Sequence, residues 1–213
     1  MAAFRAAEAA GYGIEMDVQL MRDGNIAVFH DPFIDRMTSA QGAISDMDAK
    51  QLRTAQLHGN AEAIPTLDQV FETIRAPIYL DIKSHGPAGK FEQRLLALIR
   101  HYKPVVAVAS FNPQTVIWFR ENAPDIPRGI ISYDYKDSTL GLLQRRKLRR
   151  MAYNSLIKPD FISYDLRALP YWRLWMIRLF KKTPVLTWTV RNHAEMERAK
   201  KYADNFLFEG IRP

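Results

Sequence analysis

Two acidic side chains lie two positions apart in a short apolar segment near the amino end of the sequence. Glu15 and Asp17 alternate with three apolar residues, Ile14, Met16 and Val18, and this alternation is typical of a half-buried β-strand. Side chains at positions i and i+2 of a strand share a face, so we expect both carboxylates to project together. Burying two acids is costly unless a positive group compensates them. The pair is a candidate cation site, and a strand with two solvent-facing acids is the alternative.

The segment that follows predicts a β-hairpin, which would bring a histidine beside this pair. Residues 19–30 contain Asp23-Gly24, a favoured two-residue hairpin turn. In that register Asp17 lies opposite His30, with Cβ atoms about 5 Å apart. A β-bulge would shift the register by one residue. His30 is therefore a candidate acid or base, and a purely structural histidine is the alternative.

A second apolar segment, Ile78–Ile82, adds a third acid and a lysine. Asp81 and Lys83 are again two positions apart and therefore share a face. The sequence contains no cysteine, and three converging carboxylates suit a hard divalent cation, Mg²⁺ or Ca²⁺. Lys83 beside them would stabilise a phosphoryl oxygen. A surface ion pair between Asp81 and Lys83 is the alternative.

Strand and helix signals alternate along the rest of the chain. The expected strands are Gly13–Val18, Ile78–Ile82, Val105–Ser110, Gly129–Ser132, Phe161–Tyr164, Val185–Val190 and Asn205–Phe208. The expected helices are Ala2–Ala10, Thr66–Arg75, Lys90–Tyr102, Pro113–Glu121, Thr139–Tyr153, Pro170–Lys181 and His193–Tyr202. This order predicts parallel strands covered by helices, with an active site at the carboxyl ends of the strands.

The expected α/β fold is a (β/α)8 TIM barrel that lacks its first strand. A closed barrel of this class needs eight strands in about 250 residues, and the helix at Ala2–Ala10 would normally follow a strand. Asp31–Ala63, with a short helical stretch at Asp46–Leu57, is expected to be a small insertion after the second barrel strand, lying over one end of the barrel. Residues 1–213 are expected to form a single domain.

Taken in order, these motifs resemble the glycerophosphodiester phosphodiesterase family. Glu15-Met16-Asp17 and His30-Asp31 match its Glu-x-Asp and His-Asp motifs. Further matches follow along nearly the whole chain, at Ile64–Phe71, Leu80–Lys83, Ala109–Phe111 and Trp188–Val190. The resemblance implies a (β/α)8 barrel that hydrolyses glycerophosphodiesters to glycerol 3-phosphate and an alcohol.

The same resemblance implies roles for individual residues. Three carboxylates would bind the cation, Mg²⁺ or Ca²⁺: Glu15, Asp17 and Asp81. His30 would be one of two histidines acting as general acid and base, and Lys83 would stabilise charge on the phosphate. Phe111 and Trp188 would line the mouth through which a small-molecule substrate enters.

The sequence departs from the family pattern in two places. Asp81 stands where the family usually has Glu, so the carboxylate is one methylene shorter. The His-Arg pair that ends the family's first strand has no counterpart in the printed sequence, which is expected to begin at an internal methionine. A catalytically inactive barrel that binds phosphodiesters or partners is therefore an alternative function. Hydrolysis of lysophospholipids, as by phospholipase D-like relatives of this fold, is another.

Composition sets broader bounds on partners and location. The net charge of +7 favours an anionic partner without choosing one. No nucleic-acid motif accompanies the basic run Arg145–Arg150, so a solvated helix face is expected there. The segment Pro170–Lys182 mixes aromatic and basic residues, which fits either peripheral membrane contact or an ordinary outer helix. The absence of cysteine fits a reducing compartment, and a cytoplasmic enzyme is expected.

Overall fold

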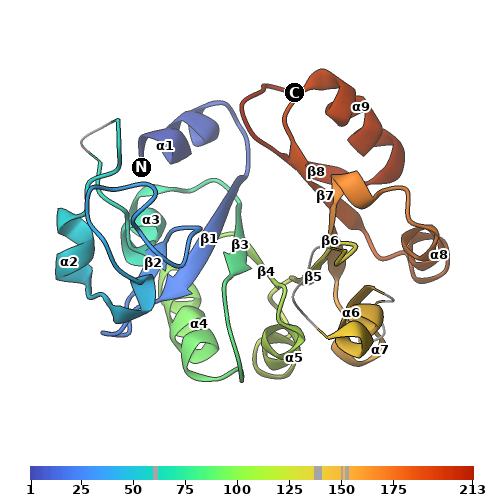
Figure 1. Cartoon of the computed structure of the whole chain (residues 1–213), viewed down its shortest axis with the longest axis horizontal. Coiled ribbons are helices and arrows are strands. Elements are labelled where there is room, and N and C mark those ends of the chain that lie inside the picture. The colour runs from blue at the N-terminus through green and yellow to red at the C-terminus, as the bar shows by residue number, and fades with distance from the viewer. Residues whose placement is uncertain (60–61, 137–140, 150, 152–153) are drawn as a thin grey trace. The chain divides into compact units, whose positions relative to one another are not determined.

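The computed structural model describes residues 1–59, 62–136, 141–149, 151 and 154–213. The chain forms two compact units, Met1–Val108 and Ala109–Pro213 (Figure 1). The assignment of residues 1–213 to a single domain stays a prediction.

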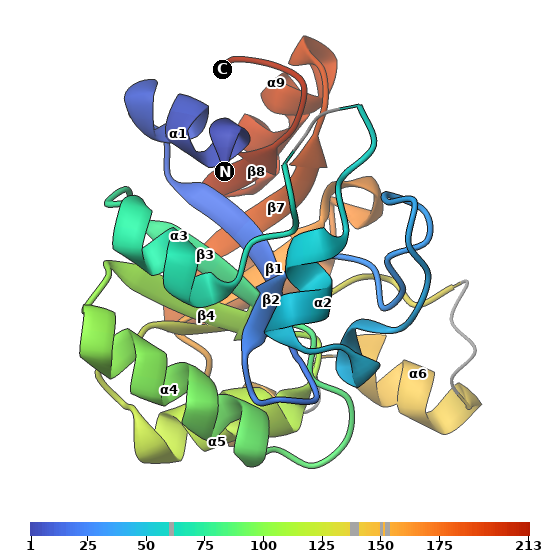
Figure 2. The same cartoon turned by 90° about the vertical axis from the view of Figure 1, so that its left-hand side faces the viewer.

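The first unit is built around two parallel strands and a hairpin arm. Its elements are α1 (Ala2–Ala9), β1 (Ile14–Leu20), β2 (Ile26–Val28), the 3₁₀ helix η1 (Ile44–Asp46), α2 (Ala49–Thr54), α3 (Leu67–Thr73), β3 (Ile78–Ile82) and α4 (Lys90–Tyr102). The strand β4 (Val106–Ser110) begins in this unit. The strands lie in the order β2-β1-β3, with β1 antiparallel to β2 and parallel to β3. The helices α3 and α4 lie side by side outside these strands (Figure 2).

Alternation along β1 separates an apolar face from a polar one. Ile14, Met16 and Val18 are buried, whereas the intervening Glu15 is exposed and Asp17 is half-buried. Because side chains alternate across a strand, the apolar face can pack while the acids remain on the opposite face. The expected strand is therefore confirmed, and so is the shared face of the two acids.

Residues 31–63 have a small apolar core of their own. Ile34, Ile44 and Leu52 are fully buried in a cluster that also includes Met21 and Ala27 of the hairpin arm. A capping box begins α2, because the backbone N–H of Gln51 donates to Asp48 Oδ1 at 2.9 Å and the Asp48 N–H donates to Gln51 Oε1 at 3.0 Å. Such caps satisfy backbone donors that a helix end leaves free. The helical stretch is shorter than predicted, and the assignment of this segment as an insertion over one end of a barrel stays a prediction.

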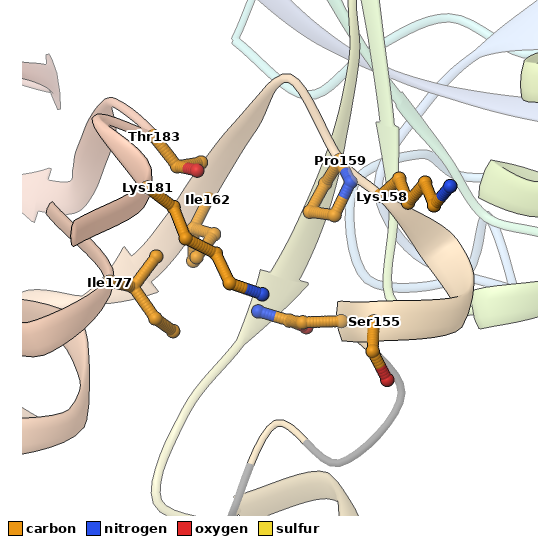
Figure 3. Close-up of a pocket in the computed structure, with 8 residues that line it drawn as sticks. Ser155, Lys158, Pro159, Ile162, Ile177, Lys181 and Thr183 are labelled. Atoms are coloured by element: carbon orange, nitrogen blue, oxygen red, sulfur yellow. The ribbon is translucent and has the colours of Figure 1, made fainter.

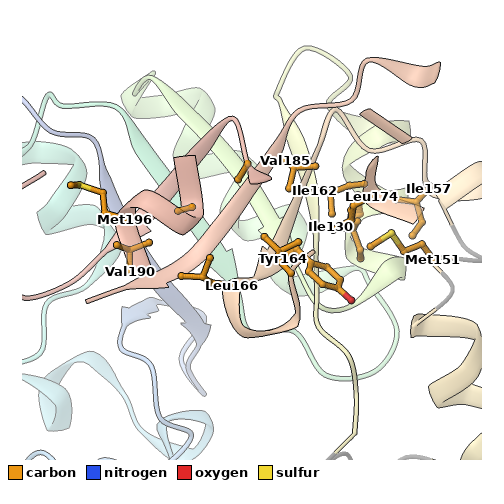
Figure 4. Close-up of a cluster of buried hydrophobic side chains, with 14 residues drawn as sticks. Ile130, Met151, Ile157, Ile162, Tyr164, Leu166, Leu174, Val185, Val190 and Met196 are labelled. Carbon is orange, nitrogen blue, oxygen red and sulfur yellow. The ribbon is translucent and has the colours of Figure 1, made fainter. Parts of the chain in front are cut away.

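The second unit repeats strand and helix in a parallel arrangement. Its elements are α5 (Pro113–Asn122), β5 (Arg128–Ser132), α6 (Leu142–Arg149), α7 (Asn154–Ile157), β6 (Phe161–Asp165), η2 (Leu166–Ala168), α8 (Trp172–Lys181), β7 (Val185–Val190), α9 (His193–Tyr202) and β8 (Asn205–Phe208). The strands lie in the order β5-β6-β7-β8, each parallel to its neighbour. Ile162, Val185, Val190 and Leu174 belong to the buried cluster that joins strands to helices here (Figure 4).

All the strands predicted from the sequence form within one or two residues of their expected bounds. The helix predicted over Thr139–Tyr153 forms in its described part as α6, over Leu142–Arg149, but it ends earlier than predicted. There α6 ends at Arg149 and α7 begins at Asn154, and Met151 between them has a φ of 52°. A left-handed residue ends a helix. The remaining residues of that prediction lie outside the described ranges.

Among the described helices, none has both the length and the apolar character that crossing a membrane requires.

Close packing of two strands in the second unit yields a stability prediction. Gly129 and Phe161 are partners in the β5–β6 ladder, and a methyl group at Gly129 would overlap the Phe161 ring. We expect Gly129→Ala to lower the free energy of unfolding by about 1–3 kcal/mol, because the core must shift to make room. Urea unfolding followed by circular dichroism measures this change.

Two further variants make that prediction specific. Gly141→Ala, where a methyl group would meet open space, serves as the matched control and should change stability little. Combining Gly129→Ala with Phe161→Leu should recover part of the loss, because contacting sites are not additive. Equal losses from Gly129→Ala and Gly141→Ala would contradict the overlap as the cause.

Candidate active site

Three carboxylates converge near the carboxyl ends of β1 and β3. Asp17 and Asp81 are direct partners in the parallel ladder, and Glu15 lies two residues before Asp17 on the same face. Each of the three offers an oxygen, and these oxygens all lie within 4.8 Å of one another. Like charges placed opposite one another on neighbouring strands repel. The arrangement therefore needs a positive partner.

Lys83 supplies that positive charge from the end of β3. Its Nζ lies 2.8 Å from Asp17 Oδ1 and 2.7 Å from Asp81 Oδ2. Its backbone N–H donates to Val18 O at 3.0 Å, which continues the β1–β3 ladder past the last strand residue. Burial opposes the ammonium charge, but Asp81 and Asp17 outweigh it and raise the pKa of Lys83. The Asp81–Lys83 ion pair forms, but it is largely buried and shared with Asp17, which differs from the surface ion pair that was the alternative interpretation.

Even with this lysine, crowding of negative charge makes the acids harder to ionise. Burial raises the pKa of Asp81 to about 6 and Asp17 adds to this effect, whereas Lys83 and His30 act in the opposite direction. Burial, followed by the charges of Asp17 and Asp81, raises the pKa of Glu15 to about 8. Glu15 is nevertheless open to solvent. Repulsion by the neighbouring carboxylates is thus the cause that the geometry shows directly.

The donor set fits a hard divalent cation. Within the described part of the chain, Asp81 Oδ1 is buried and has no hydrogen-bond partner, and a buried acceptor is normally satisfied. Carboxylate oxygens are the preferred ligands of Mg²⁺ and Ca²⁺. Opposite ligands of Ca²⁺ are up to about 5 Å apart, so the spread of these oxygens matches such an ion without rearrangement of the strands. The oxygen of Asp81 that Lys83 leaves unused is thus available to a cation.

The hairpin differs from the prediction in its turn and its register. Val18 pairs with Val28, and the Phe29 N–H donates to Asp17 O at 2.9 Å, so Asp17 lies opposite Phe29 rather than His30. The turn holds three residues, because Met21 N–H donates to Asn25 O and Gly24 adopts a φ of 84°. A type I turn followed by a left-handed glycine produces this hairpin. The prediction of a two-residue turn is therefore wrong, and the observed register differs by one residue from the predicted one.

His30 pairs with the next residue, Asp31, and strand pairing does not place it opposite the acidic cluster. Its side chain is 69% exposed and its Nδ1 lies 2.7 Å from Asp31 Oδ1. Asp31 Oδ2 accepts a hydrogen bond from Arg36 Nε at 2.6 Å. Arg36 and His30 together lower the pKa of Asp31 to about 2. Asp31 therefore remains ionised and orients the imidazole, leaving Nε2 available for proton exchange.

Gln19 anchors the segment that carries His30 and Asp31. It follows Glu15 and Asp17 on the same face of β1, and its Nε2 donates to Phe29 O at 2.7 Å and Asp31 O at 2.8 Å. Gln19 is buried, so these bonds are shielded from competing water. Gln19 and Arg36 were not among the residues selected from the sequence. The i+2 spacing from Asp17 could have indicated Gln19, but no periodic pattern points to Arg36.

In the second unit, two aromatic residues chosen from the sequence meet. The Phe111 and Trp188 rings lie 6.0 Å apart, edge to face at 84°, and Phe111 contacts Tyr133 in the same way at 6.1 Å. This geometry is a favourable aromatic contact. Trp188 also lines a cavity of about 240 Å³ beyond the carboxyl ends of β6 and β7, with Asp165, Leu166, Arg167, Thr189, Arg191, Glu195 and Arg198.

Comparison with known proteins agrees with this fold. The chain is 31% identical over 216 residues to a glycerophosphodiester phosphodiesterase of Caldanaerobacter subterraneus, covering 94% of this chain and 83% of the relative. A solved phosphodiesterase of Oleispira antarctica in complex with sn-glycerol-3-phosphate has a TM-score of 0.80 at 18% identity, covering 97% of this chain and 85% of that one. A glycerophosphodiester phosphodiesterase of Thermotoga maritima has a TM-score of 0.74 at 21% identity, covering 97% and 86%.

These likenesses identify a TIM-barrel-like α/β fold. Residues 1–205 match the model of the glycerophosphoryl diester phosphodiesterase family. The chain belongs to this family of phosphoric diester hydrolases. The resemblance inferred from the sequence motifs is therefore confirmed.

The raised pKa values of the acids predict how stability depends on pH. A carboxyl group with a raised pKa binds its proton more tightly in the folded chain than in the unfolded chain, where acids titrate near pH 4. Between about pH 4 and pH 8 the folded chain therefore holds extra protons, and stability falls as pH rises. In the presence of a chelator, we expect the free energy of unfolding to be lower at pH 8.5 than at pH 5.5 by on the order of 1 kcal/mol, allowing for the exposure of Glu15.

Unfolding of a neutralised variant tests the origin of that dependence. Glu15→Gln should reduce the difference in the free energy of unfolding between pH 5.5 and pH 8.5, because it removes the group with the pKa of about 8. Glu197→Gln, an exposed acid on α9, is the matched control and should keep the wild-type slope. If the two variants have the same slope, Glu15 is not the group responsible.

Proposed function

We propose that this protein hydrolyses glycerophosphodiesters with the help of a divalent cation, releasing glycerol 3-phosphate and an alcohol. The observation that carries the proposal is the convergence of Glu15, Asp17 and Asp81 around a largely buried Lys83. Three acids that can hold a cation, beside a lysine that can stabilise phosphate charge, are suited to binding and polarising a phosphodiester. The family to which the chain belongs supports the same reaction class.

Glu15, Asp17 and Asp81 are the residues proposed to hold the cation, Mg²⁺ or Ca²⁺. When bound, such an ion neutralises phosphate charge and polarises the phosphorus–oxygen bonds. Lys83 contributes an additional positive charge on the same face of β3, and it is proposed to stabilise charge on a nonbridging phosphate oxygen. The unused oxygen of Asp81 supports this assignment.

His30 is proposed as a general acid or base in this reaction. Its Nδ1–H donates to Asp31, so Nε2 is the atom that would exchange a proton with water or the leaving alcohol. Asp31 supports the imidazolium form during that exchange and is itself kept ionised by Arg36. This use of an acid to orient and stabilise a histidine is well suited to proton transfer.

The family resemblance assigns substrate contacts to Phe111 and Trp188, and we include them in the proposal. An aromatic pair provides apolar surface for the alcohol part of a diester. The Oleispira antarctica neighbour was solved with sn-glycerol-3-phosphate, which supports a glycerol phosphate substrate for this chain. Hydrolysis of lysophospholipids remains the second candidate function. The reaction would be the same, and the substrates differ only in the alcohol or acyl portion that the site must accept.

The missing family motif motivates the inactive alternative. The printed sequence contains no His-Arg pair, and the family uses a second histidine for proton transfer. Under the inactive alternative the acidic cluster binds phosphodiesters without turnover. A cytoplasmic location remains part of the proposal.

Release of glycerol 3-phosphate from glycerophosphocholine in Mg²⁺ or Ca²⁺ tests the proposed reaction. We expect His30→Ala to lower kcat by about 10²–10⁴-fold, because removal of an acid or base costs that much. His101→Ala, an exposed histidine on α4, is the matched control and should retain wild-type turnover. Equal activity of the two variants would contradict the role of His30.

A chimeric protein distinguishes the proposed hydrolysis from the inactive alternative. The 213-residue chain is assayed beside a chimera that carries a first strand with a His-Arg pair from an active relative. Turnover in either protein supports hydrolysis. If both proteins bind a glycerophosphodiester but neither releases product, the inactive alternative holds. Turnover of lysophospholipid without turnover of glycerophosphocholine favours the second candidate.

Gln19 yields a prediction about positioning rather than chemistry. Gln19→Met removes both donors to the segment around His30 while nearly preserving side-chain volume. We expect kcat to fall about tenfold or more through misplacement of His30, with KM and cation affinity within about twofold of wild type. Gln93→Met on the exposed face of α4 is the control. A change in KM or cation affinity as large as that in kcat would instead indicate a general structural defect.

A further inference from the structure

The helix α8 is apolar on two opposite faces. Its inner face packs into the second unit, because Leu174 is 2% exposed and belongs to the buried cluster (Figure 4). Ile177, three residues later, faces a cavity of about 310 Å³ near the amino ends of β6 and β7 (Figure 3). Leu174 and Ile177 therefore face the protein, and Arg178 of α8 also donates to Tyr202 O at 3.1 Å.

The outer face of α8 carries apolar residues at the spacing that is typical of an amphipathic helix. Trp172, Trp175, Met176, Leu179 and Phe180 occupy positions i, i+3, i+4, i+7 and i+8, which form one stripe along a helix. Four of them, the two tryptophans, Leu179 and Phe180, are between 55% and 71% exposed. A helix that packs one apolar face on its own protein normally presents polar residues on the other. We name these five residues the outer stripe.

Basic residues surround the outer stripe without any acidic residue nearby in the sequence. Between Leu166 and Ala194 the chain has no Asp or Glu and six Lys or Arg residues: Arg167, Arg173, Arg178, Lys181, Lys182 and Arg191. The Arg173 guanidinium lies 4.7 Å from the Trp172 ring centroid, and Lys182 follows the helix as an exposed residue. Arg167, Arg178 and Arg191 form ion pairs with Asp165, Asp204 and Glu209. The positive charge beside the exposed apolar stripe therefore comes from Arg173, Lys181 and Lys182.

We propose that the outer stripe docks the protein on a membrane surface that contains anionic lipids. Tryptophan side chains favour the boundary between headgroups and acyl chains, and a cationic helix with an apolar face binds that boundary in the plane of the membrane. Arg173 and Lys182 would contact anionic headgroups while their aliphatic stems lie along the apolar stripe. This surface is independent of the acidic cluster, and it adds a lipid partner to a soluble-substrate reaction.

The charges argue against a second copy of the chain as the occupant. A two-fold contact places the same patch of both copies together, so the basic residues beside the stripe of one copy would face the basic residues of the other. No acidic residue of the 166–194 segment is available to offset this repulsion. An anionic lipid surface offsets it directly.

Co-sedimentation with vesicles tests the proposal in the presence of a chelator, so that binding is measured without turnover. Vesicles of phosphatidylcholine with one-third phosphatidylglycerol should bind the wild-type chain, and pure phosphatidylcholine should bind it far more weakly. Trp172→Ser combined with Trp175→Ser should weaken binding by at least about tenfold, because each exchange removes large apolar surface. Arg173→Gln combined with Lys182→Gln should weaken it by about thirtyfold, as roughly 1 kcal/mol per basic residue implies.

Two controls decide whether the outer stripe is the bound surface. Val105→Ser removes another exposed apolar side chain, in the first unit, and should leave vesicle binding unchanged. Trp172→Phe with Trp175→Phe should still bind but lose the blue shift of tryptophan fluorescence that accompanies insertion. Wild-type binding by the serine double variant, or a blue shift that persists in the phenylalanine variant, would overturn the proposal.

The oligomeric state of the protein tests whether the outer stripe is used for self-association instead. Light scattering should give the mass of a monomer, 24.6 kDa, for the wild-type chain without lipid. A dimer that the serine double variant converts to monomer, together with no vesicle binding, would assign the stripe to self-association and overturn the membrane proposal. Failure of turnover with retained vesicle binding would overturn only the enzymatic proposal.

Discussion

Mutual repulsion among three carboxylates is the constraint around which the first unit is built. Asp17 and Asp81 are held opposite one another by the β1–β3 ladder, and Glu15 shares their face. In water these groups would separate, but the hydrogen-bonded strands prevent it. Lys83 offsets part of the repulsion with two short ion pairs. Electrostatic energy that is unfavourable to folding is thus retained in a form that a cation can relieve, which is characteristic of functional sites.

The surrounding structure supports this cluster through neutral and charged hydrogen bonds. Gln19 ties the segment after β2 to β1, and Arg36 reaches back to Asp31 from residues 31–63. That segment can serve as a support because Ile34, Ile44 and Leu52 give it an apolar core. An exposed imidazole would otherwise sample many orientations. Contacts that run from β1 through Gln19, and from Arg36 through Asp31, therefore restrict His30, the residue proposed for proton transfer.

Features with a short period could be predicted from the sequence, and features set by tertiary contacts could not. The shared face of Glu15 and Asp17 follows from the two-residue period of a strand, and the match of Asp81 follows from similar strand ends. The hairpin register failed because Asp23-Gly24 suits both a two-residue and a three-residue turn. The Asp31–Arg36 ion pair lies in a segment without periodicity, so the sequence could not predict it. The sequence showed α8 only as a mixture of aromatic and basic residues, and the burial of Leu174 was needed to show which face is packed.

Because Asp17 and Asp81 face one another, the proposed active site depends on a single alignment of β1 and β3. A slip of one residue would turn Glu15 and Asp17 toward the layer that Ile14, Met16 and Val18 occupy, while those three apolar side chains would enter the polar recess. A change that shifted this alignment would therefore break up the acidic cluster. The buried residues Ile14, Met16 and Val18 thus hold the proposed site together, although none of them belongs to the cluster.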